Sequence, residues 1–240
     1  MNLAGSHWRS IAVVLATVAA AVVAPVTASA ATSPVVVPID STYQGKTYGE
    51  WSEAWWQWAA ARRSFSHCPA ESGPVYFLSA PADTSCVVPP HRGILFPAFT
   101  AEWSVAEANL WEQQHPGQTC PVPASPSGTD YDALLACAGA QADYATHPNS
   151  QLTATVDGQA VPDLTGYRAA SPPPPFTLRP VRGNLVGIPD EASGRRTEAV
   201  SDGFWILLEP LPRGEHTITF GASIPDLQLN FSATYRLRVL

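Results

Sequence analysis

"FSATYRLRVL", residues 231–240, is the clearest structural signal in the chain. Every second residue in it is apolar: Phe231, Ala233, Tyr235, Leu237 and Val239. Successive side chains of a strand point to opposite faces of its sheet. The pattern therefore predicts an antiparallel strand with one buried face and one solvated face.

Strand signals extend over most of the remaining chain. They are "GPVYFLSA" (73–80), "CVVP" (86–89), "GILFPAFT" (93–100), "ATVDGQAV" (154–161), "FTLRPV" (176–181), "EAVSDGFWILLEPL" (198–211) and "EHTITF" (215–220). Short apolar runs bounded by Pro, Gly and Asp are typical of strands buried on both faces or of a sandwich core. The chain is therefore predicted to be mainly β.

An N-terminal helix is predicted for "YGEWSEAWWQWAAARR" (48–63), ending near Ser64. Thr47 and Glu50 have the spacing of a capping box, in which each side chain satisfies a backbone amide of the other residue. At 100° per residue, Trp51, Trp55, Trp58 and Arg62 fall in one narrow stripe. This stripe is expected to fasten the helix to the sheet, because a buried Trp removes on the order of 200 Å² from water.

Trp56 lies about 140° from that stripe, on the same side of the helix as Arg63. If this side is open, Trp56 can stack on a sugar ring or another planar ligand. If the helix lies in a deep groove, Trp56 belongs to the core as well. The sequence leaves both interpretations open.

Two further helices are predicted in the middle of the chain, over 100–114 with Thr100 as the cap and over 131–147. They make a helical insertion at about 100–150. The order of helix, strands, helices and strands predicts one antiparallel β-sandwich domain over 31–240, jelly-roll or immunoglobulin-like.

Residues 1–30 have the features of a signal peptide. Arg9 precedes the apolar run 11–23, Pro25 breaks it, and the small residues up to Ala30 suit signal peptidase. No later segment is apolar for the roughly 18 residues that a membrane helix needs, so no membrane insertion is expected after cleavage near Ala30. The mature protein is predicted to be secreted, extracellular or periplasmic.

Four cysteines follow the signal peptide: Cys68, Cys86, Cys120 and Cys137. An even number in an exported chain favours disulfides. Three pairings exist, and the sequential one closes two short loops. No Cys-x-x-Cys spacing suggests a metal site.

Composition and motifs exclude several classes of function. The formal charge of −7, with Lys46 as the only lysine, makes nucleic acid an unsuitable partner. No motif of a nucleophilic enzyme, zinc protease or dinucleotide-binding protein is present, so no catalytic residue, metal or cofactor is predicted. A glycoside hydrolase needs two carboxylates that face each other across the substrate. Glu50 and Glu53 share one helix and are interpreted as solvated charges, although Asp202 or Glu209 could supply a distant partner carboxylate. His216 is expected on one strand face with apolar neighbours, as a core histidine or a ligand contact.

Four blocks together resemble a family of exported bacterial proteins without assigned activity. The blocks are "YGEWSEAWWQWA", "GPVYFLSA", "VPPHRGILFPAF" and "VSDGFWILLEPLPRGEHTITF" with the final strand. The resemblance implies secretion and a mainly β domain, and it supplies no catalytic residues.

Three functions remain open from the sequence. The first is non-catalytic binding of an envelope polysaccharide, another glycan or a protein partner, with Trp56, Arg63 and His216 as candidate contacts. The second is a secreted hydrolase, which needs two carboxylates or a histidine-centred cluster in a pocket. The third is a structural or self-associating surface protein, which needs an exposed apolar patch or an unprotected edge strand.

Overall fold

The computed structural model describes residues 35–63, 68, 73–122, 126–184 and 186–240. The predicted signal peptide and Ser64 lie outside the described residues. The residues that are described all belong to one compact unit.

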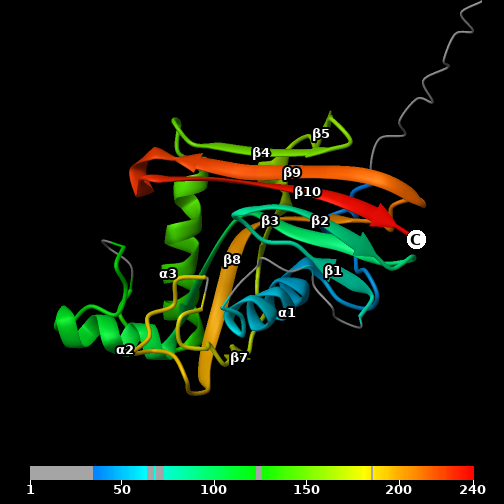
Figure 1. Cartoon of the computed structure of the whole chain (residues 1–240). Helices are drawn as coiled ribbons and strands as arrows, with labels where there is room; N and C mark the ends of the chain where they lie inside the picture. The colour runs from blue at the N-terminus through cyan, green and yellow to red at the C-terminus, as the bar shows by residue number, and fades with distance from the viewer. Residues whose placement is uncertain (1–34, 64–67, 69–72, 123–125, 185) are drawn as a thin grey trace, which may run out of the picture. The chain divides into compact units, whose positions relative to one another are not determined.

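The described strands form two five-stranded sheets, which we call the central and the outer sheet (Figure 1). The central sheet contains β1 (Val75–Phe77), β3 (Gly93–Ser104), β8 (Thr197–Leu208), β6 (Arg168–Ala170) and β7 (Phe176–Leu178). The outer sheet contains β2 (Ala82–Val88), β10 (Leu229–Val239), β9 (Gly214–Ile224), β4 (Gln151–Val156) and β5 (Gln159–Ala160). The predicted mainly β sandwich with helices is confirmed.

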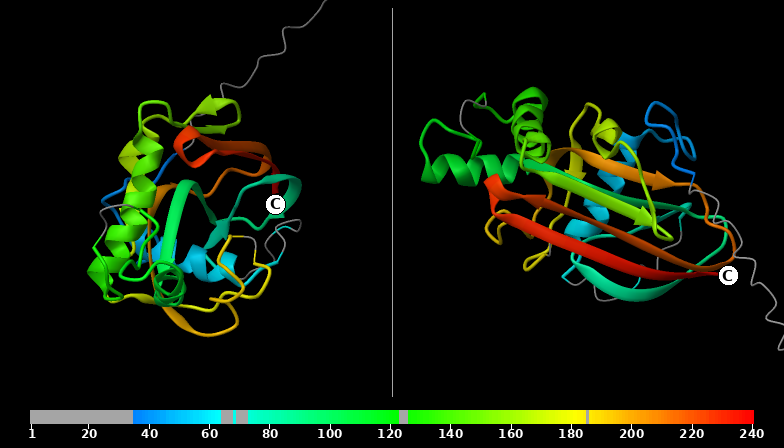
Figure 2. Two further views of the ribbon diagram at one scale, coloured as in Figure 1. Left: turned by 90° about the vertical axis from the view of Figure 1, so that its left-hand side faces the viewer. Right: turned by 90° about the horizontal axis from the view of Figure 1, so that it is seen from above.

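The helical elements are short and lie around these sheets (Figures 1 and 2). The α-helices are α1 (Tyr48–Ala60), α2 (Val105–Gln114) and α3 (Tyr131–Asp143). The 3-10 turns are η1 (Tyr144–Thr146), η2 (Leu164–Tyr167) and η3 (Pro225–Leu227). Helix α1 ends at Ala60, earlier than predicted. The carbonyl of Ala60 accepts a hydrogen bond from the amide of Val181 at 2.9 Å.

The central sheet is buried on both faces. In β8, Ile206 and Leu208 join the core shared with the outer sheet, while Trp205 and Leu207 join the core beneath α1. A strand with no solvated face has no polar alternation, and this explains the continuous apolar run in β8. The layers are therefore outer sheet, central sheet and α1.

The final strand has the predicted alternation, with Ala233, Tyr235, Leu237 and Val239 buried and with Arg236 and Arg238 exposed. It pairs antiparallel with β9, as a hairpin partner must. The expectation of purely antiparallel sheets is wrong in two places, because β10 pairs parallel with β2 and β1 pairs parallel with β3. No turn joins β2 to β10, so no hairpin dictates their relative direction.

The first helix of the predicted insertion begins later than expected. Thr100 is not its cap, because β3 continues through Ser104 in antiparallel pairing with β8. Ser104 is the cap instead, and its hydroxyl and the Glu107 carboxylate form the capping box of α2. Both Thr100 and Ser104 can cap a helix, and pairing with β8 decides between them.

Two disulfides are present, Cys68–Cys86 and Cys120–Cys137, which is the sequential pairing. The first joins β2 to the segment after α1, and the second joins α3 to the segment that precedes it. Two disulfides fit an oxidising compartment. None of the helices in the described ranges has both the length and the apolar character that a bilayer crossing requires.

Candidate functional site

Helix α1 is held at both its start and its middle. The predicted capping box is confirmed, with the Glu50 carboxylate accepting from the Thr47 amide at 2.7 Å. The indole N–H of Trp55 donates to the carbonyl of Leu78 at 2.8 Å, and that of Trp51 donates to the carbonyl of Tyr43 at 2.9 Å. These bonds fix the positions from which neighbouring side chains project.

Trp56 is buried, with 5% of its surface exposed, so the alternative in which its side of the helix is open is not observed. Its ring packs edge-on against Trp55, with 5.3 Å between centroids. Trp58, in the predicted packing stripe, is more exposed than Trp56 and lies beneath the guanidinium of Arg62. The groove interpretation is therefore correct: protein surrounds α1 on more than one side.

A bulge in β3 supplies the polar partner of Trp56. The register with β8 shifts between Pro97 and Phe99, which moves the alternation of side chains by one residue. Without this shift, Thr100 would share the face of Phe96, which looks toward the outer sheet. Instead its hydroxyl accepts from the Trp56 indole at 3.2 Å and donates to the carbonyl of Asp202 at 3.1 Å.

An open hollow of about 200 Å³, here called the apolar recess, lies beside these residues. Its lining consists of Trp55, Trp56, Ala80, Pro97, Phe99, Thr100, Val186, Leu229 and Phe231. Thr100 has the only side-chain hydroxyl in the lining, and that hydroxyl is already engaged as both donor and acceptor. The apolar recess therefore offers contact surface and few free hydrogen-bonding groups.

A second hollow, of about 400 Å³, is here called the arginine recess. It is lined by Arg63, Arg179, Pro180, Val181, Arg182, Gly194, Arg195 and Arg196. Five of the thirteen lysine and arginine residues of the whole chain thus surround one hollow, and no Asp or Glu is part of its lining. The predicted contact residue Arg63 is one of the five.

Hydrogen bonds join residues 180–184 to residues 188–194 beside the arginine recess. The amide side chain of Asn184 bridges the carbonyls of Val181 and Ile188, and its oxygen accepts from the amide of Ile188. The amide of Gly194 donates to the carbonyl of Pro180 at 2.8 Å, which closes the segment on itself. Buried Ile188 anchors the segment in the core beneath α1.

Arg63 is attached to the same segment. Its Nε donates to the carbonyl of Arg182 at 2.9 Å, which leaves its two terminal nitrogens without a partner among the described residues. None of the five guanidinium groups forms an ion pair with a described carboxylate. The arginine recess therefore gathers five like charges that have no direct carboxylate partner among the described residues.

His216 lies in β9, and none of its observed contacts is with Trp56 or Arg63. As predicted, it shares a strand face with buried Ile218 and Phe220. Its Nδ1 lies 2.7 Å from an Asp157 carboxylate oxygen, and its Nε2 lies 2.9 Å from the Pro212 carbonyl. Two acceptors occupy both ring nitrogens, so His216 ties two turns together. No cluster of three or more potential metal ligands exists within the described ranges.

Three glutamates could carry acid–base chemistry, and none lies in either recess. Burial raises the pKa of Glu53 to about 7, so this residue is not the freely solvated charge that the sequence suggests. Glu102 and Glu107 are buried and share a hydrogen bond, and burial holds the pKa of Glu102 well above its usual range. The Glu107 carboxylate is committed to the capping box of α2.

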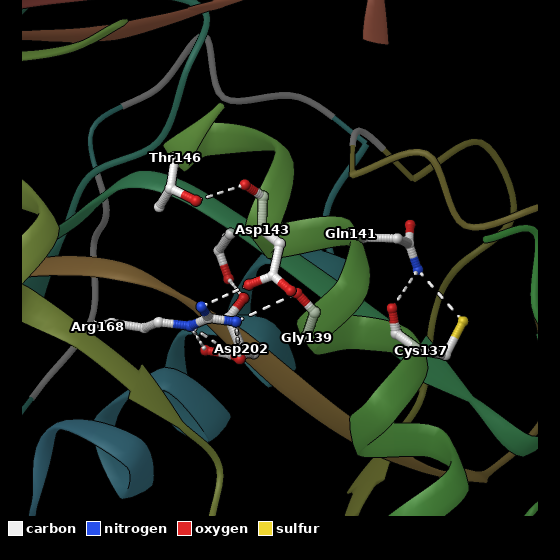
Figure 3. Close-up of polar contacts among 8 residues, drawn as sticks. Cys137, Gly139, Gln141, Asp143, Thr146, Arg168 and Asp202 are labelled. Atoms are coloured by element: carbon white, nitrogen blue, oxygen red, sulfur yellow. Dashed lines mark hydrogen bonds and ion pairs between the residues drawn. The ribbon is translucent and has the colours of Figure 1, made fainter. Parts of the chain in front are cut away.

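Asp202, a candidate partner carboxylate, is occupied by Arg168 (Figure 3). The Nη2 of Arg168 lies 2.8 Å from an Asp202 oxygen, and its Nη1 lies 2.6 Å from an oxygen of Asp143 in α3. Nη2 also donates to the carbonyl of Gly139 at 3.2 Å. This cluster joins α3 to β6 and β8, which is a structural role.

The arginine recess is the feature that sequence reasoning missed. Its signal was present as "RPVR" (179–182) and "RR" (195–196), separated by a segment rich in glycine and polar residues. Without the folded segment, nothing indicates that these arginines meet Arg63.

No family model, curated protein or solved structure matches this chain. The resemblance to a family of exported proteins therefore stays a prediction from the sequence.

Proposed function

We propose that this is an exported, non-catalytic binding protein that holds an anionic group of its ligand in the arginine recess. The ligand is a component of the cell envelope, such as an acidic glycan that carries carboxylate, sulfate or phosphate groups. One observation supports this: five arginines surround a hollow of about 400 Å³ whose lining contains no carboxylate.

Arginine suits such a ligand. Its planar guanidinium donates two parallel hydrogen bonds to a carboxylate or phosphate, and it remains charged at all physiological pH values. Five like charges close together repel one another, so an anion bound among them gains from several at once. Hydrogen bonds of Asn184 and Gly194 hold the backbone that carries four of these arginines, so less backbone has to be ordered when a ligand binds.

The charge distribution of the chain favours a discrete anionic group over a long polyanion. The formal charge of the whole chain is −7, so a nucleic acid lying along the surface meets net repulsion. A carboxylate or phosphate that enters the arginine recess meets the local positive charge within a Debye length of about 10 Å.

The two other functions have less support. A hydrolase needs carboxylates or histidines that converge in a hollow, whereas neither recess includes an Asp, Glu or His among its described lining residues. A self-associating protein needs a continuous apolar surface. Of the large apolar side chains that are exposed within the described ranges, Val87 in β2 and Leu240 directly after β10 lie at the same end of the β2–β10 pair, whereas Val35 and Leu227 lie on other segments. Two neighbouring side chains make only a small apolar patch.

Export outside the cytoplasmic membrane is part of the proposal. The two disulfides and the N-terminal sequence pattern support it. Expression with an N-terminal sequencing step on the secreted product tests it, and we expect the mature chain to start directly after Ala30.

The binding test uses purified protein with galacturonic acid oligosaccharides and with neutral maltooligosaccharides, followed by isothermal titration calorimetry. Replacing Arg182 and Arg195 together by serine should weaken binding of the acidic sugar at least tenfold. The matched control replaces Arg236 and Arg238, two exposed arginines of β10, and changes the net charge equally. Equal losses in both variants, or equal binding of the neutral sugar, would show that the arginine recess is not the site.

A further inference from the structure

The apolar recess and the arginine recess share two walls. Helix α1 supplies Trp55 and Trp56 to the apolar recess, and Arg63 lies three positions after its last residue, Ala60. The segment 179–196 supplies Val186 to the apolar recess and four arginines to the other. A ligand held by one recess therefore lies close to the other.

The end of α1 connects the two recesses. Ala60, the last residue of the helix, lies four positions after Trp56, which is a rise of about 6 Å. The carbonyl of Ala60 accepts a hydrogen bond at 2.9 Å from the amide of Val181, a residue in the lining of the arginine recess. The bond from Arg63 to the carbonyl of Arg182 keeps the guanidinium on the segment that also carries Val186.

The apolar recess suits hydrocarbon. Its walls are four aromatic rings with aliphatic side chains and proline, and its one hydroxyl, on Thr100, is already bonded on both sides. Ordered water in proteins typically makes about three hydrogen bonds, and these walls offer few. A dry cavity of about 150 Å³ accommodates benzene, so a hollow of about 200 Å³ is large enough for a short chain or one ring.

We infer that the ligand is a monomeric amphiphile, with an anionic head in the arginine recess and a hydrocarbon chain in the apolar recess. This inference rests on the proposed function, because it assigns the chemical class of the group attached to the bound anion. Val186 would contact the chain, and Arg179, Arg182, Arg195 and Arg196 would contact the head.

The experiment compares methyl phosphate with octyl phosphate by isothermal titration calorimetry, below the critical micelle concentration as checked by light scattering. Each methylene that leaves water adds roughly a factor of four in affinity. Burial of only part of the chain should therefore make octyl phosphate bind at least tenfold more tightly than methyl phosphate.

Two variants fill the apolar recess from different walls, Val186→Phe and Leu229→Phe. Each should remove most of the additional affinity that the octyl chain gives over methyl phosphate, and should leave the affinity for methyl phosphate unchanged. Val87→Phe is the matched control, because Val87 is 54% exposed on β2 and outside both recesses. Thermal unfolding identifies any variant that fails to fold, and the other variant then carries the test.

The outcomes separate the two proposals. Methyl phosphate that binds through the arginines, without gain from the chain, overturns the amphiphile and leaves the anion site. A chain advantage that survives both filling variants, or appears only with micelles, also overturns it. If neither phosphate loses affinity when Arg182 and Arg195 become serine, the arginine recess is not the head site and both proposals fail.

Discussion

Replacing Arg168 by methionine tests whether a largely buried charge pair holds α3 on the central sheet. Arg168 contacts Asp202 through Nε at 3.1 Å and through Nη2 at 2.8 Å. The Asp202 side chain is 10% exposed, whereas that of Arg168 is 35% exposed. Methionine keeps an apolar chain near Phe204 but removes every donor that Asp202 uses.

The expected loss in the free energy of unfolding follows from the burial of this ion pair. Removing one partner of a buried ion pair leaves an uncompensated charge and costs about 3–5 kcal/mol. Because Arg168 is partly exposed, water offsets some of the loss, so we expect the lower end, about 3 kcal/mol. The carbonyl of Gly139 loses its donor as well.

The assay is urea unfolding followed by tryptophan fluorescence with the disulfides intact, and the free energy of unfolding is compared between variants. Arg236→Met is the matched control, since Arg236 pairs with Asp83 at 2.6 Å with both side chains more than half exposed. An exposed pair contributes about 0.2–1 kcal/mol, so this variant should change stability little.

A double variant isolates the buried charge. Arg168→Met with Asp202→Asn removes the unpaired carboxylate, so it should regain most of the stability lost in Arg168→Met. The reasoning is refuted if Arg168→Met costs no more than Arg236→Met, or if the second substitution brings no recovery.

Three further predictions concern the scaffold around the recesses. Burial raises the pKa of Glu102, so the folded chain keeps the proton of this carboxyl to higher pH than the unfolded chain does. The free energy of unfolding that this protonation contributes is therefore lost as pH rises above the ordinary pKa of 4.5. Glu102→Gln keeps a donor for Glu107 without a titrating proton, so the variant should have a higher free energy of unfolding than the unsubstituted protein, by more at pH 9 than at pH 5. The same difference at both pH values would contradict this. Gly203→Ala should destabilise by about 2 kcal/mol or more in the same assay, because its Cβ would lie 2.6 Å from the backbone of Thr100 opposite the bulge; an unchanged free energy of unfolding would mean that the bulge adjusts freely. Replacing Cys120 and Cys137 by serine opens a loop with a sequence separation of 17 and should cost about 3 kcal/mol by urea unfolding, whereas a cost near zero would mean that the helices hold this loop without the disulfide.

Several elements could be predicted from the sequence because interactions between neighbouring residues determine them. The alternation in 231–239 and the Thr47–Glu50 capping box depend on neighbouring residues only, and both are confirmed. Periodicity also predicted α1, although Trp56 was harder to place. A helical wheel describes one helix by itself, and it cannot tell how many sides of that helix other elements cover.

Thr100 shows where local signals compete. Its hydroxyl reads as a helix cap, and so does that of Ser104 four residues later. Ten register pairs between β3 and β8 include Thr100 and end at Ser104, so strand pairing extends past the first cap. The bulge then turns Thr100 toward Trp56, an outcome that no spacing in the sequence signals.

The sequence by itself determined the mainly β class, the capped tryptophan helix and the presence of cysteines suited to disulfides. These depend on periodicity, capping and composition, which act over a few residues. Only the tertiary structure decided the two parallel strand pairings, the burial of Trp56 and the meeting of Arg63 with arginines more than a hundred residues away. Contacts between distant segments depend on how whole layers pack, and the energy of that packing is shared among many side chains, so no single stretch of sequence encodes it.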